Sequence, residues 1–497
     1  MSKTTTTRRR FLGQASCTAV GATSLFSTLV NMRAAGALAQ TQPRIQPAGV
    51  LPGNDYKAMV CLFLAGGNDS FNMLVPRGNP EYAEYAGIRA DLALAQNTLL
   101  PITPTTSDGR EYGVHPNMPE VQQMFGAGEL AFIANVGALV EPTTKAGINA
   151  GTASVPLGLY SHADQITHWQ TSIPDQRASL GWGGRVADLL RSSNTNDTVS
   201  MNISLSGTNI FQSGSQVVPY ATTPQGSIGI TGYEELGLFD ELRTTAINSL
   251  IDQQYQNLFI DTFAQTTRKA IDGNKLFSSA IAGVPPLTTT FSANSISQSF
   301  QMVARTIAAR QTLGVRRQTF FILFGGWDHH DEVINAQAAM LPVVSKGLKE
   351  FRDALVELGV FQDVVTYTAS DFARTLTSNG QGSDHAWGGN HIVMGGPVRG
   401  GDIYGQYPQL FADNDLDMGR GRLIPTLSCD EYFAELAMWL GVSNSDLSTV
   451  VPNLDRFYTI GGSQAPIGFI NGLGTPPIFS DGFESGGLSA WSSVVNG

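Results

Sequence analysis

"YKAMVCLFLAGGNDS", residues 56–70, joins a nearly continuous apolar run to a cluster of small and polar residues. A run that is apolar at successive positions, rather than at alternate ones, is typical of a strand covered on both faces. Strands of this kind form parallel sheets, and ligand sites of such sheets lie at the carboxyl edge. The segment therefore predicts an α/β fold that places residues 66–70 at this edge.

Two later segments repeat the arrangement. The apolar run 319–324 is followed by Gly-Gly-Trp-Asp-His-His at 325–330, and the run 364–368 leads into Ser370, Asp371 and a glycine-rich loop. Asp with neutral His is a ligand set that suits a divalent metal. We therefore predict a metal site at the shared edge, and the candidate ligands are Asp69, Asp328, His330, Asp371, Asp384, His385 and His391.

Asp328, His329 and His330 form the strongest local signal, because the whole chain has only seven histidines. Alternation along an extended segment puts Asp328 and His330 on one side, while His329 points away or orients a ligand. The alternative is a hydrogen-bonded polar turn above the sheet that binds no metal. Asp371, at the end of a strand that the sheet must bury, needs a metal, Arg374 or a helix N-terminus as its partner.

The nucleophile is harder to place than the ligands. Ser70 follows Asp69 and is either a nucleophile or the cap of a following helix, with capping favoured. Ser161 and His162 form a second candidate pair, and we take Ser161 as the rival nucleophile. Arg374 or His162 is the candidate to hold an anionic group.

The remaining pattern predicts alternating helices and strands around one large domain, residues 56–460. Helices are expected over 233–266, 295–311 and 333–358, and loops with short strands over 150–235 as an insertion above the sheet. Residues 40–55 are expected to form a linker, and the Gly- and Ser-rich residues 461–497 a tail that serves in sorting or surface retention or is simply disordered.

The N-terminus predicts export. Thr7-Arg8-Arg9-Arg10-Phe11-Leu12, a mild apolar stretch and Ala37-Leu38-Ala39 have the order of a twin-arginine signal peptide over residues 1–39. Its removal takes five of the 30 basic residues and no acid, which leaves 25 basic against 41 acidic residues, a formal charge of −16. Such a chain should repel nucleic acid and anionic lipid. We expect a periplasmic or extracellular protein, exported folded by the twin-arginine machinery, with no membrane span after processing.

The quoted clusters, together with Ser370-Asp371-Phe372-Ala373-Arg374 and Gly382-Ser383-Asp384-His385-Ala386-Trp387, resemble the uncharacterised "domain of unknown function 1501" family. That family is similar to the alkaline phosphatase and sulfatase superfamily. The resemblance implies a three-layer α/β fold with a mostly parallel central sheet and a site for one or two divalent metals, such as zinc, calcium, magnesium or manganese. It assigns Asp69, Asp328, His330 and Asp371 to the metals. Phe372 stands where the superfamily has a His, and His385 is the expected substitute.

The resemblance implies an exported metal-dependent hydrolase of phosphate or sulfate esters, acting on a small molecule or a polymer. A formylglycine sulfatase is disfavoured, because the chain has no Cys-x-Pro-x-Arg motif. Two alternatives stay open. One is a non-catalytic exported metal-binding or surface protein, which the lack of a secure nucleophile favours. The other is a metal-free serine esterase that uses Ser70, since Gly66-Gly67-Asn68-Asp69 resembles a block of the SGNH hydrolases.

Overall fold

A ten-stranded, mostly parallel sheet forms the centre of the protein, in a computed structural model that describes residues 55–473. The predicted signal peptide, most of the linker and the end of the tail lie outside the described residues. The strands, in the order in which they lie across the sheet, are β12 (Ile403–Tyr404), β5 (Leu130–Gly137), β11 (Gly389–Met394), β10 (Val364–Ser370), β1 (Lys57–Ala65), β9 (Arg317–Gly325), β6 (Asn202–Ser204), β7 (Tyr220–Thr223) and β8 (Gly226–Ser227), with β13 (Leu427–Ser428) beside β5.

Only β11 and β8 run antiparallel to their neighbours. A separate small sheet contains β2 (Leu74–Pro76), β4 (Tyr112–Val114) and β3 (Leu100–Ile102). The helices are α2 (Glu81–Arg89), α3 (Pro119–Gly126), α4 (Lys145–Asn149), α5 (His162–Thr171), α6 (Trp182–Leu190), α7 (Leu238–Ile251), α8 (Leu258–Ala282), α9 (Ser295–Ala308), α10 (Val333–Glu357), α11 (Cys429–Leu440) and α12 (Leu447–Val450).

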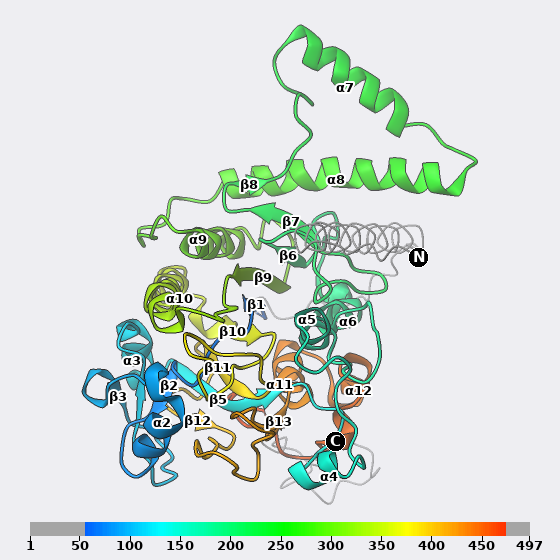
Figure 1. Cartoon of the computed structure of the whole chain (residues 1–497). Coiled ribbons are helices and arrows are strands. Elements are labelled where there is room, and N and C mark those ends of the chain that lie inside the picture. The colour runs from blue at the N-terminus through cyan, green and yellow to red at the C-terminus, as the bar shows by residue number, and fades with distance from the viewer. Residues whose placement is uncertain (1–54, 474–497) are drawn as a thin grey trace, which may run out of the picture.

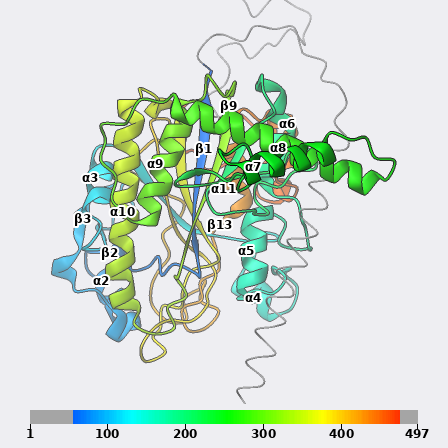
Figure 2. The ribbon, with the colours of Figure 1, turned by 90° about the horizontal axis from the view of Figure 1, so that it is seen from above.

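Helices cover both faces of the sheet, which gives three layers (Figures 1 and 2). Side chains of β1 alternate between the two faces, as strand geometry requires. Val60 and Leu62 lie in the core under α3, α9 and α10, whereas Cys61 and Phe63 lie in the core under α6 and α11. Because both faces are buried, β1 has no polar alternation. The predicted α/β class with its mostly parallel central sheet is confirmed.

The register of the three central strands aligns their carboxyl ends. Leu64 of β1 pairs with Ser370 of β10 on one side and with Phe324 of β9 on the other. The residues that follow, Gly66 and Asp371 among them, therefore meet at one edge of the sheet. The strands predicted at 56–65, 319–324 and 364–368 are confirmed.

Residues 150–235 differ in part from the prediction of loops and short strands. The short strands β6, β7 and β8 are present, and β6 and β7 extend the central sheet. However, the region also contains α5 and α6, which pack on the second face of the sheet. Glycines and polar residues obscure these helices in the sequence, since their apolar faces are short: Trp169 on α5 and Trp182 and Val186 on α6.

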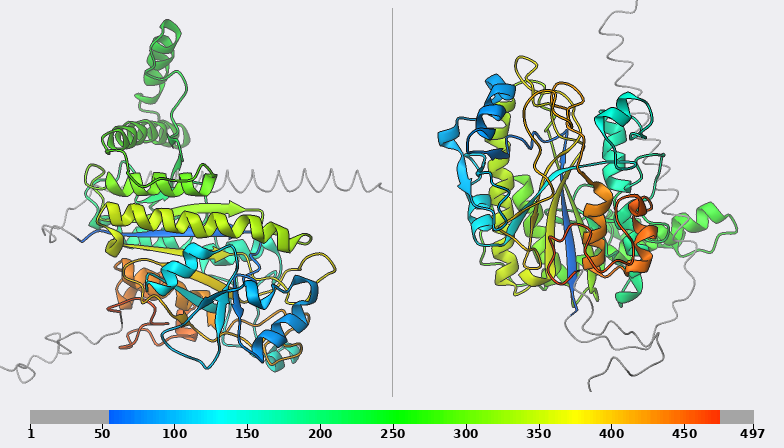
Figure 3. Two further views of the ribbon diagram at one scale, coloured as in Figure 1. Left: turned by 90° about the vertical axis from the view of Figure 1, so that its left-hand side faces the viewer. Right: turned by 90° about the horizontal axis from the view of Figure 1, so that it is seen from below.

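The helix predicted over 233–266 is two helices, α7 and α8. The chain breaks at Asp252, and α8 restarts where the Asn257 side chain accepts hydrogen bonds from the backbone N–H groups of Phe259 and Ile260. Residues 236–263, which we call the arm, project from the body of the protein (Figures 1 and 3). The second half of α8 packs on the body through Phe277 and Ile281.

The body extends beyond the predicted boundary at residue 460. Phe469 and Ile470 are buried in the second core. The Glu435 carboxylate accepts hydrogen bonds from the backbone N–H groups of Ile467, Gly468 and Ile470, at 2.7–2.8 Å. The apolar residues 467–470 thus close the fold after the glycine-rich stretch that marked the predicted boundary. Among the described residues, no helix has both the length and the apolar character needed to cross a bilayer.

Candidate metal centre

Two glycines allow the strand ends to pack closely. Gly66 and Gly67 have φ values of +121° and +84°, which L side chains rarely adopt. A Cβ on Gly66 would lie 2.5 Å from the backbone nitrogen of Asp328, and one on Gly67 would lie 2.5 Å from the Phe372 ring. The Gly66 N–H also donates to Asp371 Oδ1 at 3.0 Å. The turn after β1 therefore brings the segments after β9 and β10 together.

Three histidines surround Asp328 at this edge. His162 is the first residue of α5, His330 follows β9, and His385 lies in the loop between β10 and β11. Asp328 Oδ1 lies 3.1 Å from His330 Nε2 and 3.3 Å from His385 Nε2, and Asp328 Oδ2 lies 3.4 Å from His162 Nε2. The Nε2 atoms of His330 and His385 are 3.0 Å apart. Three ligand-type side chains, those of His162, Asp328 and His385, thus form one group, and His330 adjoins it through Asp328 Oδ1 and His385.

Each imidazole is oriented by its other nitrogen. His162 Nδ1 lies 2.7 Å from Asp371 Oδ2, His330 Nδ1 lies 3.0 Å from Asp384 Oδ1, and His385 Nδ1 lies 2.7 Å from the Tyr160 carbonyl oxygen. Ionised carboxylates and carbonyls only accept hydrogen bonds, so each Nδ1 carries the proton in the neutral ring. Each Nε2 then presents a lone pair toward Asp328. A histidine whose second nitrogen is held by a carboxylate or carbonyl is the common arrangement around a protein metal.

These residues fit a divalent metal. Lone pairs that face one another and a carboxylate repel unless a cation lies between them. His162 Nε2 is buried and has no hydrogen-bond partner. A tetrahedral zinc ion with bonds of about 2.0–2.1 Å separates its ligand atoms by about 3.3 Å. The distances from each histidine Nε2 to the nearer Asp328 oxygen, and from His330 Nε2 to His385 Nε2, are 3.0–3.4 Å. Ligand atoms of His162, Asp328 and His385 all lie within 4.8 Å of one another.

The pKa values follow from these contacts. The hydrogen bond from His162 to Asp371 raises the pKa of His162, whereas burial lowers the pKa of His385. Burial opposes ionisation of Asp328, but the hydrogen bond from Arg374 and the positive charges of Arg374, His162 and His330 together outweigh burial and lower the pKa of Asp328. Burial likewise opposes ionisation of Asp384, yet hydrogen bonds from Asn379, Arg420 and His330 lower its pKa to about 2. The low pKa of His385 keeps its Nε2 free of a proton, as metal binding requires.

The other four histidines are buried and lie outside the cluster: His115, His168, His329 and His391. His391 was predicted as a ligand, but it is part of β11, and its ring lies 4.6 Å from Trp169 and 6.1 Å from Tyr432, between ring centres. Burial lowers the pKa of His391 to about 3. The prediction was wrong because residues 389–394 continue the sheet rather than the glycine-rich loop.

Three predicted ligands bind arginines or histidines instead. Asp69 Oδ2 lies 2.6 Å from Arg89 Nη2, and both side chains are fully buried. Asp371 uses Oδ1 for Gly66 and Oδ2 for His162, so it positions a histidine rather than facing the cluster. Asp384 likewise holds His330.

Arg374 is placed to hold a carboxylate rather than a substrate anion. Its side chain has no exposed surface, and Nη1 donates to Asp328 Oδ1 at 2.7 Å and to the Gly66 carbonyl at 3.3 Å. Nη2 donates to the Ser383 carbonyl. The predicted anion-binding role of Arg374 therefore conflicts with its geometry, since the protein itself occupies its donors.

The two candidate serines lie in different surroundings. Ser70 is buried, and its Oγ accepts a hydrogen bond of 2.8 Å from the Asn390 N–H. No helix starts directly after it, so it is neither the predicted cap nor an accessible nucleophile, and the esterase hypothesis based on it is wrong. Ser161 is half-buried at the N-cap of α5, beside His162, and its side chain makes no capping bond.

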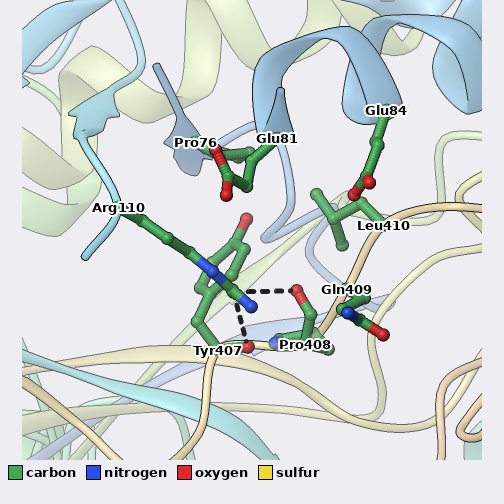
Figure 4. A pocket seen from close by; sticks show the side chains of 8 residues that line it. All are labelled: Pro76, Glu81, Glu84, Arg110, Tyr407, Pro408, Gln409 and Leu410. Atoms are coloured by element: carbon green, nitrogen blue, oxygen red, sulfur yellow. Dashed lines mark hydrogen bonds between the residues drawn. The ribbon is translucent and has the colours of Figure 1, made fainter. Parts of the chain in front are cut away.

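Solvent reaches the metal centre. The side chains of Asp328 and His330 are 44% and 46% exposed, and His162 and His385 are 31% and 24% exposed. A hollow of about 60 Å³ lies elsewhere and shares no residue with this cluster (Figure 4). Arg110 closes it by donating to the carbonyls of Tyr407 and Pro408 at 2.9 and 3.4 Å. Sites for small molecules enclose a few hundred Å³ or more, so this hollow suits water rather than a substrate.

Sequence reasoning missed four groups that organise the centre: Arg89, the Tyr160 carbonyl, Ser383 and Arg420. Arg420 pairs with Asp384 at 2.6 Å, and Ser383 Oγ lies 3.3 Å from Asp69 Oδ2. The need of a buried Asp69 for a cation was a signal for an arginine, but nothing in the sequence identified Arg89 as the partner.

Comparison with protein families gives one match. The family described as "Protein of unknown function (DUF1501)" matches residues 56–418, which include Asp328 and the three histidines around it. The chain belongs to this family. Comparison with curated proteins finds no similar sequence.

Solved structures show remote likenesses. A sulfatase, PsFucS1, from Pseudoalteromonas sp. is 11% identical, with a TM-score of 0.32, and the match covers 84% of this chain and 72% of that one. The lipoteichoic acid synthase LtaP from Listeria monocytogenes is 9% identical, with a TM-score of 0.26 and coverages of 76% and 72%. The alkaline phosphatase from the Antarctic bacterium TAB5 is 13% identical, with a TM-score of 0.25 and coverages of 69% and 92%. At these identities and TM-scores, the similarity carries no argument about the reaction of this protein.

Proposed function

We propose that the protein is an exported metal-dependent hydrolase of phosphate or sulfate esters. The observation that carries the proposal is the convergence of three histidine Nε2 atoms and the Asp328 carboxylate at a solvent-accessible sheet edge. The substrate class follows from the sequence resemblance described above. Small-molecule and polymer esters both fit a site that is open on one side.

The metal would be held by His162, His330, His385 and Asp328. A divalent ion there would supply Lewis-acid chemistry, which activates a hydroxyl nucleophile and stabilises charge on the ester oxygens. The chain's own residues fix the geometry. Asp371, Asp384 and the Tyr160 carbonyl hold the three rings in the tautomer that presents Nε2, and Arg374 fixes the Asp328 carboxylate.

Ser161 is the proposed nucleophile. It directly precedes His162, its hydroxyl is not used as a cap, and it lies at the N-terminus of α5, where the helix dipole favours negative charge. Ser161→Ala should lower kcat by at least about 100-fold while leaving metal content unchanged, because Ser161 is not a ligand. Unchanged kcat would assign the attack to water instead.

We place the protein in the periplasm or outside the cell, after export by the twin-arginine route. The order of motif, apolar stretch and cleavage site in residues 1–39 supports this placement, as does the strongly acidic composition of the rest of the chain. A folded metal site is compatible with a route that carries folded proteins.

The decisive experiment measures metal content and ester hydrolysis together. The purified mature protein should bind divalent metal in near-stoichiometric amount, and Asp328→Ala or His385→Ala should remove both the metal and the activity. His329→Gln is the matched control, because His329 is adjacent in sequence but lies outside the cluster. Ester hydrolysis that survives chelation would overturn the proposal. Stoichiometric metal without turnover of any ester would support the non-catalytic alternative instead.

A further inference from the structure

We infer that the centre takes one divalent metal rather than two, that three arginines paired with its carboxylates supply the remaining positive charge, and that its substrate is a singly charged ester. The inference rests on the proposed function for the substrate, but the metal count stands on geometry alone. Two metals would need carboxylates beyond Asp328. The structure shows what each of the other carboxylates binds.

Asp69, the first candidate for a second metal, is closed to it. Its Oδ2 pairs with Arg89 at 2.6 Å, with both side chains fully buried. Its Oδ1 is buried without a hydrogen-bond partner. A divalent ion at this oxygen would lie beside Arg89, whose guanidinium stays charged at any ordinary pH. Repulsion between like charges is strong where water is excluded, so we expect no metal there.

Arg374 occupies the space between Asp328 and Asp69. Its Nη1 donates to Asp328 Oδ1, and its Nε lies 3.5 Å from Ser383 Oγ, which in turn lies 3.3 Å from Asp69 Oδ2. The guanidinium therefore shares Asp328 Oδ1 with His330 and His385 and holds this oxygen from within the cluster. Any second ion that shared Asp328 as a bridging ligand would have to displace it.

The remaining two carboxylates, Asp371 and Asp384, also have protein partners that occupy their oxygens. Asp371 binds the Gly66 N–H and His162, and Asp384 binds His330, Asn379 and Arg420. Both orient histidines from the side opposite to the Nε2 atoms. Within the described residues, the geometry thus leaves one set of ligands that faces a common point.

The net charge of the centre predicts the charge of its substrate. Four carboxylates (Asp69, Asp328, Asp371 and Asp384) face three guanidinium groups (Arg89, Arg374 and Arg420), which leaves a formal charge of −1. One divalent ion changes this to +1. A sulfate monoester or a phosphate diester carries one negative charge and matches that value, whereas a phosphate monoester carries two at pH 8. We therefore assign the centre to singly charged esters.

Metal analysis tests the count. The mature protein, loaded with zinc or manganese and dialysed, should contain about one ion per chain by mass spectrometry of the elements. The double variant Asp69→Asn with Arg89→Met removes both buried charges together and should keep this value. Two ions per chain in the unmodified protein, or loss of the ion in a folded double variant, would overturn the one-metal assignment whether or not the protein hydrolyses anything.

Kinetics with three aryl esters test the charge. The kcat/KM for p-nitrophenyl sulfate or bis-p-nitrophenyl phosphate should exceed that for p-nitrophenyl phosphate by at least tenfold at pH 8, and the first two substrates distinguish sulfatase from phosphodiesterase activity. A preference for p-nitrophenyl phosphate would refute the substrate assignment and leave the hydrolase proposal standing. Hydrolysis of none of the three would refute the substrate assignment, while the hydrolase proposal is decided by the combined metal and ester-hydrolysis experiment above and the metal count by the elemental analysis.

Discussion

In most proteins charged side chains are exposed and large apolar side chains are buried. The metal centre and the arm both depart from this distribution, in opposite ways. In the centre, charged groups such as Arg89 and Arg374 are fully buried and held by defined partners. In the arm, large apolar side chains lie in solvent: Phe239 is 79% exposed and Phe259 is 74% exposed. The same pattern extends to Leu242, Leu250, Leu258 and Phe263.

This difference predicts which of the two regions contributes more to the free energy of unfolding. Burying a charge costs free energy unless the charge has a partner. Each ion pair in the centre therefore requires its neighbouring side chains to keep one arrangement. Exposed apolar side chains in the arm contribute little to folding, because unfolding does not change their contact with water. Mutations in the two regions should therefore have effects of very different size.

The largest effect is expected from breaking a buried ion pair. Arg89→Met leaves the Asp69 carboxylate buried without a cation and should cost about 3–5 kcal/mol in the free energy of unfolding. Arg268→Met is the matched control on the exposed side of α8, where Arg268 pairs with the exposed Asp252; its cost should be below about 1 kcal/mol. Denaturant unfolding measures both. Equal costs would show that burial does not separate the two regions.

A smaller effect, on metal affinity, is expected when the carboxylate that orients one histidine is removed. Asp384→Ala removes the acceptor of His330 Nδ1 and should weaken metal binding about 10–100-fold, since partners of metal-ligating histidines contribute this much. Titration of the metal-free protein measures the affinity. Asp240→Ala in the arm, which removes the partner of Arg243, is the control and should leave the affinity unchanged. An unaltered affinity in Asp384→Ala would mean that His330 is not a ligand.

The smallest effect is expected in the arm itself. Phe259→Ser and Phe263→Ser should each change the free energy of unfolding by no more than about 0.5 kcal/mol. The comparison is Phe300→Ala on α9, a fully buried ring stacked 4.9 Å from Phe351, which should cost about 3–5 kcal/mol. A loss above about 1 kcal/mol in either arm variant would show that these side chains are covered in solution.

The sequence was sufficient for features that depend on local pattern. Continuous apolar runs identified β1, β9 and β10, and the parallel register carried Asp328 and Asp371 to one edge. His330 and His385 were predicted as ligands because they follow buried strands whose carboxyl ends meet at one edge of the sheet, and the structure places both beside Asp328. The family resemblance implied Asp328 and His330 as metal ligands and His385 as the substitute for a missing His.

Features that depend on packing between distant segments were not predictable. His162 begins a helix on the second face of the sheet, and only the folded chain places its ring beside Asp328. Asp69 and Asp328 look equivalent in the sequence, since each follows a buried strand and a pair of glycines. Their roles differ because Arg89 on α2 neutralises one of them, and that contact leaves no local trace.

The three histidines also have a mechanical consequence. They belong to three parts of the chain that are far apart in sequence: the start of α5, the segment after β9 and the loop before β11. An ion shared by them would act as a removable cross-link, and its contribution to stability would grow with free metal concentration, reaching about 2.7 kcal/mol at a hundred times the Kd. Both cysteines of the described residues are buried and free. The supply of metal around the protein would then set how stable the fold is.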